Sequence, residues 1–139
     1  MIARVLVAMD GSEMAEKALE FALDAYPDAE ITVLTVVGAP TWFMGEATGL
    51  ALADDPQQAA AERARPVFER ARALAAEHDA EIDTTVALGP PARTIVERAD
   101  AFDVVVLGGH GRDLSSRVLL GNIAETVARR SPVPVTVVR

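Results

Sequence analysis

The stretch Asp103-Val-Val-Val-Leu-Gly-Gly-His-Gly111 decides the fold class of this chain. Its apolar part is short and continuous, which is typical of a strand buried on both faces of a parallel sheet. Glycines follow that strand at once, and Gly121 precedes a helical pattern that begins at Asn122. A buried strand, a glycine-bearing loop and a helix in this order predict an α/β fold with its site at the carboxyl end of the strand.

Four other apolar runs alternate with helical patterns around this stretch. Together they predict strands at residues 2–9, 30–37, 81–88, 103–107 and 132–138, and helices at residues 12–26, 56–78, 91–99 and 122–130. The alternation predicts a single doubly wound, three-layer α/β/α domain over residues 1–139, with a five-stranded, mostly parallel sheet. Pro132 and Pro134 favour an edge position for the last strand, because proline cannot donate to a sheet ladder.

Local signals predict where several helices begin. Ser12 is suited to cap the first helix, and Asp55 is suited to cap the second. Asn122, with Glu125 three residues later, predicts a capping box at the last helix. Pro66 lies inside the second helical pattern, where it predicts a kink or a break.

The composition excludes several classes of function. Acidic residues number 21 and basic residues 13, and the net charge of −8 disfavours nucleic acid and anionic membranes as partners. The chain has no cysteine and two histidines, which argues against a cysteine nucleophile and a multi-histidine metal site. The first apolar run stops at Asp10, too short for a signal peptide or a membrane span, which predicts a cytoplasmic protein. Abundant alanine and a single lysine are typical of a haloarchaeal or other GC-rich prokaryotic source.

The strand ends predict where a ligand binds. In a doubly wound sheet, ligands lie beyond the carboxyl ends of the strands, where the winding direction reverses. Three segments are expected at that edge: residues 9–11, 36–38 and 108–111. Glycine lets successive backbone N–H groups point into one concavity, and the helix N-terminus at Asn122 offers further N–H groups. These features predict a polyphosphate cradle with positive charge from Arg112 and Arg117; the alternative is a tight connection in which glycine serves turn geometry alone.

The glycine spacing resembles the nucleotide signature of the universal stress protein family of the UspA type. That signature is Gly, two residues, Gly, nine residues, Gly, then Ser or Thr, and here it reads Gly108-x2-Gly111-x9-Gly121-Asn122. Further segments resemble the family in the same order: the first strand with its Asp10-Gly11-Ser12 turn, Gly89-Pro90-Pro91, and the closing residues 131–138. The resemblance covers essentially the whole chain, which makes it far more specific than a single glycine motif.

The resemblance implies an adenine-nucleotide alpha hydrolase-like fold with strand order 3-2-1-4-5. It also implies a homodimer through antiparallel pairing of the last strands, between Val133 and Val138. In the ATP-binding branch it implies ATP, with Mg or Mn on its phosphates. The site positions that it implies are Asp10 and Gly108 at the ribose, Ala8, Met9 and the Val36 backbone at the adenine, and Gly111, Gly121, Asn122 and Ile123 at the phosphates, beside Arg112.

The sequence favours regulation over fast catalysis. It contains no Gly-x4-Gly-Lys-Ser/Thr loop, its single lysine, Lys17, lies in the first helix, and no base to activate water is evident. We therefore predict an ATP-binding protein with a regulatory role in the stress response and no dedicated catalytic residue. A slow ATPase stays open, and so does a nucleotide-free dimeric interaction module, because Asn122 stands where the family has Ser or Thr.

Other features exclude related functions or leave alternatives open. An ATP-consuming ligase of related fold would carry a Ser-Gly-Gly-x-Asp-Ser type loop where Asp10-Gly11-Ser12-Glu13 stands, and a Rossmann dehydrogenase would carry Gly-x-Gly-x-x-Gly there. Trp42-Phe43-Met44, within residues 38–55, covers the base, packs on a partner subunit or forms a loop tip. For His110 the alternatives are contact with phosphate, a role in proton transfer, or a solvated loop position.

Overall fold

The computed structural model describes residues 1–38, 55–109 and 121–139. Within these ranges, helices and strands alternate along the chain. Their bounds are β1 (Arg4–Ala8), α1 (Glu13–Ala25), β2 (Glu30–Val37), α3 (Pro56–Glu77), β3 (Asp83–Leu88), α4 (Pro91–Ala99), β4 (Val104–Gly108), α5 (Asn122–Arg130) and β5 (Val135–Val138). The described helices include none that is long and apolar enough to cross a membrane.

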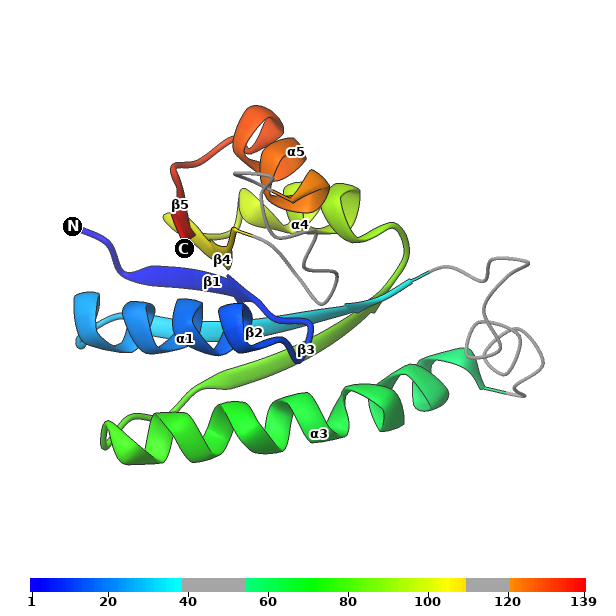
Figure 1. Ribbon diagram of the computed structural model, residues 1–139, viewed down its shortest axis with the longest axis horizontal. Coiled ribbons are helices and arrows are strands. Elements are labelled where there is room, and N and C mark those ends of the chain that lie inside the picture. Colours follow the sequence, from blue (N-terminus) through cyan, green and yellow to red (C-terminus); the bar gives the residue numbers. More distant parts are fainter. Residues whose placement is uncertain (39–54, 110–120) are drawn as a thin grey trace.

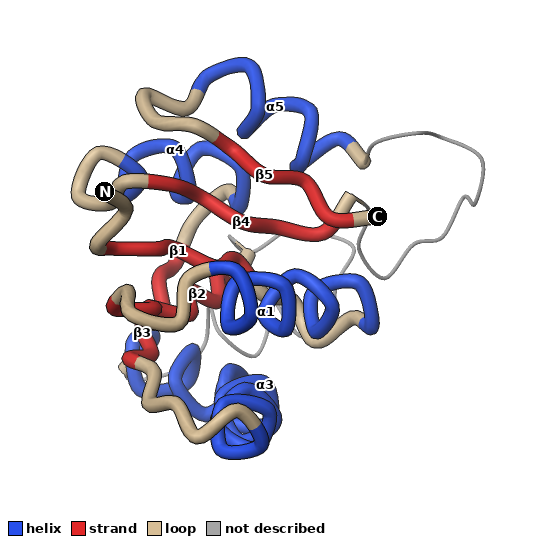
Figure 2. Tube along the Cα trace, turned by 90° about the vertical axis from the view of Figure 1, so that its left-hand side faces the viewer, coloured by secondary structure: helices blue, strands red, loops and turns tan. Residues whose placement is uncertain are grey.

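The strands form one parallel sheet in the order β3-β2-β1-β4-β5. Helices α1 and α3 cover one face of this sheet, and α4 and α5 cover the other (Figures 1 and 2). The predicted doubly wound sheet and its strand order are therefore confirmed. The edge position predicted for the last strand is also confirmed. Pro132 and Pro134 lie just before β5, and the Pro134 carbonyl accepts the N–H of Val105 in β4 at 3.0 Å, a bond that needs no N–H from the proline.

The central strands explain why the sheet has two covered faces. Val5 and Val7 of β1 are buried against α1 and α3, whereas Leu6 between them is buried against α4 and α5. Strand β4 alternates in the same way, with Val104 and Val106 on the α1 side. Each of these side chains contributes about 1.5–3 kcal/mol through burial. A run without polar residues is thus what a central parallel strand requires.

Two predicted helix features differ in the structure. The N-cap of α5 is Gly121, and no side chain in the described ranges caps this helix. Glu125 instead pairs with Arg129, with 2.9 Å between Oε1 and Nη2. The capping box predicted at Asn122 is wrong, because the helix begins one residue earlier than the box requires. Helix α3 continues through Pro66, so the predicted break is absent, while the predicted alternative, a kink, stays a prediction. Pro66 and Glu62, one turn earlier, are both exposed, so water can reach the carbonyl that loses its partner.

Candidate functional site

The central strand β1 ends earlier than both of its neighbours. Its last paired residues are Ala8, opposite Leu34 of β2, and Val7, opposite Val106 of β4. Strand β2 continues for Thr35-Val36-Val37, and β4 continues for Leu107-Gly108. We call this part of the carboxyl edge, from the end of β1 to these two overhanging strand ends, the β1 step. It lies where the winding direction of the sheet reverses, which is where ligands bind in this class of fold.

The chain leaves β1 through a tight turn that its own side chains close. The N–H of Met9 donates to the carbonyl of Leu34 at 2.9 Å, which is the last contact between β1 and β2. An oxygen of the exposed Asp10 carboxylate then accepts the N–H of Ser12 at 2.9 Å, across Gly11 with its φ of +84°. Glycine is suited to this left-handed backbone conformation. Asp10 therefore has a structural task in this turn, and it also offers a carboxylate at the step.

The chain leaves β4 through glycines that allow close packing. A Cβ on Gly108 would lie 2.8 Å from Cγ of Met14 and 3.0 Å from the Met14 backbone, so glycine lets the first turn of α1 rest against the end of β4. The N–H of Gly109 donates to the carbonyl of Val138 in β5 at 2.7 Å. The N–H of Gly121 donates to the carbonyl of Gly109 at 2.5 Å. This last contact holds the start of α5 beside the end of β4.

Helix α5 begins with backbone donors that no side chain of the described residues satisfies. The carbonyl of Gly121 accepts the N–H of Glu125 at 3.0 Å, as the first turn of a helix requires. The N–H groups of Asn122, Ile123 and Ala124 come before this turn closes, and they have no acceptor within the helix. They also carry the partial positive charge of the helix N-terminus. The start of α5 therefore has a geometry suited to binding an anion, and it lies at the β1 step.

The universal stress protein family model matches residues 1–139. The chain belongs to this family. Universal stress protein YxiE of Bacillus subtilis is 28% identical over 148 aligned residues, and the alignment covers 100% of both chains. The solved UspA of Lactobacillus plantarum is 26% identical, with a TM-score of 0.79 and coverage of 99% of this chain and 98% of that one. A universal stress protein solved in complex with cAMP is 27% identical, with a TM-score of 0.71 and coverage of 99% and 97%.

The site residues predicted for this universal stress protein are brought together in part. Ala8, Met9, Asp10, Val36 and Gly108 belong to the ends of β1, β2 and β4, and Gly121, Asn122 and Ile123 form the start of α5. Met9 is only 4% exposed and its side chain packs in the core cluster under α1 and α3. Asn122 and Ile123 are exposed, the latter by 44%. Gly111 and Arg112 lie outside the described residues, as do His110, Arg117 and Trp42-Phe43-Met44.

Thr35 was not predicted as a site residue, and Gly109 was predicted only as part of the segment 108–111, without a role of its own. Gly109 is buried and joins β5 to the start of α5 through its two backbone hydrogen bonds. Thr35 is buried in the overhanging end of β2, and its hydroxyl has no hydrogen-bond partner in the described part of the chain. A polar residue inside the apolar run Ile31 to Val37 was the available signal for Thr35. The sequence contains no comparable signal that distinguishes Gly109 from the neighbouring glycines.

The shifted pKa values of this domain lie away from the step. Two backbone hydrogen bonds, from the N–H groups of Ala3 and Arg4 at 2.8 and 2.9 Å, lower the pKa of Asp103 at the amino end of β4. A hydrogen bond to the Leu74 carbonyl raises the pKa of His78 at the end of α3, with a smaller contribution from Asp24. Groups of three or more His, Asp or Glu that could hold a metal are absent from the described ranges.

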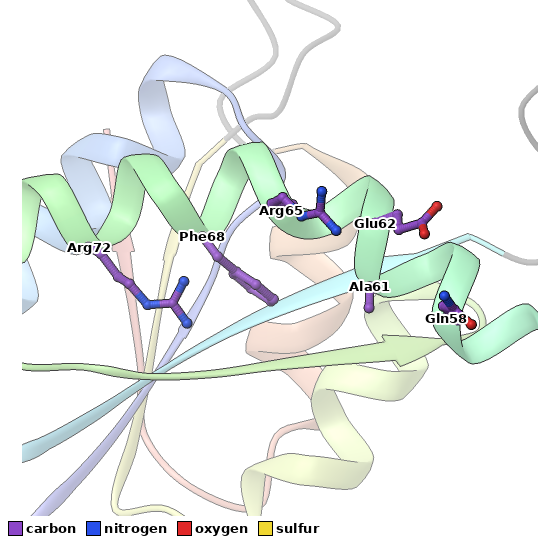
Figure 3. Close-up of a pocket in the computed structure, with 6 residues that line it drawn as sticks. All are labelled: Gln58, Ala61, Glu62, Arg65, Phe68 and Arg72. Atoms are coloured by element: carbon purple, nitrogen blue, oxygen red, sulfur yellow. The ribbon is translucent and has the colours of Figure 1, made fainter.

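A surface groove of about 280 Å³ runs along α3 (Figure 3). The side chains that line it are Gln58, Ala61, Glu62, Arg65, Phe68 and Arg72. Phe68 and Arg72 point from the helix toward the strands, and Arg72 Nη2 donates to the Thr84 hydroxyl of the edge strand β3 at 2.8 Å. None of the predicted site residues lines this groove, so the β1 step remains the candidate site.

Proposed function

We propose that this universal stress protein binds an adenine nucleotide, with ATP as the expected ligand, at the β1 step. The observation that carries the proposal is the uncapped N-terminus of α5, tied to the end of β4 by the bond from Gly121 to Gly109. Backbone N–H groups at a helix start bind phosphate without help from a lysine or a histidine. The solved relative in complex with cAMP supports an adenine nucleotide as the class of ligand.

The proposed arrangement follows the chain around the step. The base lies against the Val36 backbone, beyond the end of β1, with Ala8 and Met9 beneath it and the ribose near Asp10 and Gly108. The phosphates lie at Gly121, Asn122 and Ile123, where the Asn122 amide can donate to a phosphate oxygen as the hydroxyl of a Ser or Thr would. Gly111 and Arg112 are proposed as further phosphate contacts. Mg or Mn would be held by the phosphate oxygens, which suit hard divalent cations.

We further propose that the liganded state regulates, and that turnover is slow or absent. Residues 1–139 would then act as one nucleotide-sensing domain in the cytoplasm. A homodimer through β5 fits the open edge of that strand, because its four residues are uncharged and half-buried. An unpaired edge strand of this kind is a template for pairing with a second copy. Sedimentation at micromolar concentration is expected to give a dimer, and a monomer would overturn this part of the proposal.

Isothermal titration of the purified protein with Mg-ATP tests the function. We expect saturable binding, together with a thermal shift that grows with ligand concentration. No heat and no thermal shift at millimolar ATP would overturn nucleotide binding and favour the dimeric interaction module. Phosphate release in the same samples separates regulation from catalysis. Phosphate release at ordinary enzyme rates, about 1 per second or faster, would overturn the proposed regulatory role.

A further inference from the structure

The described core contains two buried polar side chains, Thr35 and Thr94, and they differ in one respect. They are 7% and 8% exposed, so water reaches neither hydroxyl well. The hydroxyl of Thr94 in α4 donates to the carbonyl of Pro90 at 2.7 Å. The hydroxyl of Thr35 in β2 has no partner among the described residues. Thr94 therefore uses its hydrogen-bonding capacity within the fold, and Thr35 does not.

An unpartnered buried hydroxyl calls for a reason. It destabilises a fold, because the hydroxyl loses its hydrogen bonds to water and gains none in return. Valine has nearly the same shape without this cost, and β2 uses valine at three nearby positions, Val33, Val36 and Val37. Packing alone would thus be served at least as well by a valine in place of Thr35. A hydroxyl at this position points to a partner outside the described fold.

The position of Thr35 indicates what that partner is. Thr35 is the first residue of β2 beyond Leu34, the last residue paired with β1. Ile31 and Val33 project under α1 and α3, and the alternation of a strand puts Thr35 on the same face. Met9 also projects to that face, and its N–H donates to the Leu34 carbonyl, so Met9 and Thr35 are neighbours at the root of the β1 step.

We propose that the Thr35 hydroxyl is a specificity-determining group that reads the heterocyclic base of the bound nucleotide. It forms a hydrogen bond with the polar edge of the base, either directly or through one trapped water. This inference rests on the proposed function, and it separates two tasks within one site. The start of α5 holds the phosphates whatever base they carry, whereas the Thr35 hydroxyl adds affinity only for a ligand that has a base.

The test compares ATP with inorganic tripolyphosphate, which carries the phosphates without the base. For Thr35→Val we expect the affinity for ATP to fall about threefold to tenfold, the fold-change of one neutral hydrogen bond. The affinity for tripolyphosphate is expected to stay unchanged. The melting temperature of the free variant is expected to rise, because the unpartnered hydroxyl is gone. Isothermal titration and thermal unfolding measure these three quantities on the full chain.

Two control variants keep the test specific. Thr35→Ser retains the hydroxyl and is expected to bind ATP within about twofold of the wild type. Thr94→Val removes a hydroxyl that has a partner, so its melting temperature should fall while its ATP affinity is unchanged. Thr35→Val with wild-type ATP affinity would overturn the inference, and so would equal losses for ATP and tripolyphosphate. If the wild type binds no ATP, the proposed function itself fails, and the role of Thr35 fails with it.

Discussion

The two helices that begin at the β1 step, α1 and α5, satisfy their first backbone N–H groups in different ways. Helix α1 follows β1 and is capped by Ser12, whose hydroxyl oxygen accepts the N–H of Ala15 at 3.1 Å. Helix α5 follows β4 and starts at Gly121, which has no side chain to offer. Both starts lie at the same edge of the same sheet. The fold completes one helix start with a side chain, whereas the other has no side-chain acceptor in the described part of the chain.

A third helix start supports this interpretation. Helix α3 begins far from the start of α5 in the chain and is capped by Asp55, whose carboxylate accepts the N–H groups of Gln57 and Gln58 at 3.1 and 3.2 Å. Capping of this kind stabilises a helix by about 1 kcal/mol. Helix α4 also begins without a side-chain cap, but Pro91 at its start has no N–H that needs an acceptor. Among the described helices, α5 thus combines a missing side-chain cap with a full set of free N–H groups at its start.

The largest effect is expected from an internal anion at α5. The backbone of Gly121, with φ −69° and ψ 160°, is one that other residues adopt, so Gly121→Asp can place a carboxylate on the free N–H groups. We expect ATP affinity to fall about tenfold to a hundredfold, the range of a hydrogen bond to a charged group. The stability of the free protein should rise by a few tenths of a kcal/mol, because glycine is itself an acceptable N-cap residue. Titration with ATP and urea unfolding measure the two effects.

Gly121→Ala is the matched control, because alanine adds neither a charge nor a capping atom. It is expected to bind ATP within a few-fold of the wild type. If Gly121→Asp binds ATP as tightly as Gly121→Ala, the phosphates do not lie at α5, and the contrast between the two helix starts carries no function.

A smaller effect is expected from the opposite change at α1. Ser12→Ala removes the cap of α1 and should cost about 1 kcal/mol of unfolding free energy, measured by urea denaturation. The ATP affinity should not change, because the ligand is proposed to use the donors of α5 and not those of α1. A loss of ATP affinity larger than about twofold without a change in stability would reverse the assignment of the two helix starts.

The fold could be predicted from the sequence because its signals are local. The run from Val104 to Leu107 and the cap at Ser12 involve neighbours in the chain, and both are present as expected. Asn122 was expected as a cap from an equally local signal, but a bond between Gly121 and Gly109 accompanies an earlier helix start. Such contacts between distant residues leave no periodic pattern.

The candidate site could be predicted in part for the same reason. The glycines and Asp10 were found by their spacing, but the spacing does not say what each one touches. Gly108 packs against Met14, a residue more than ninety positions earlier, and that contact alone accounts for a glycine there. The unpartnered hydroxyl of Thr35 depends on every element that buries it. Neither the packing of Gly108 against Met14 nor the missing partner of the Thr35 hydroxyl can be predicted from the sequence alone.

The smallest effect concerns the other end of α1, which is held by a titratable contact. The imidazole of His78 lies with Nε2 3.2 Å from an Asp24 carboxylate oxygen and with Nδ1 3.0 Å from the Leu74 carbonyl oxygen. Both ring nitrogens thus face acceptors, and only the doubly protonated ring can donate to both. The Leu74 carbonyl and the carboxylates of Asp24 and Glu20 accordingly raise the pKa of His78.

Because the folded pKa of His78 is raised, this contact stabilises the protein fully below the unfolded pKa of about 6.5 and is lost as pH rises through the folded value. We expect the contribution of His78 to the melting temperature to be larger at pH 5.5 than at pH 8. His78→Gln should flatten that part of the pH dependence, as measured by thermal unfolding of both proteins across this range. His78→Gln should leave the ATP affinity unchanged at both pH values, because this contact stabilises the fold and is not part of the proposed site. Equal pH dependence in the two proteins would show that His78 does not hold the end of α1, and a change in ATP affinity would show that this end of α1 is coupled to the proposed site.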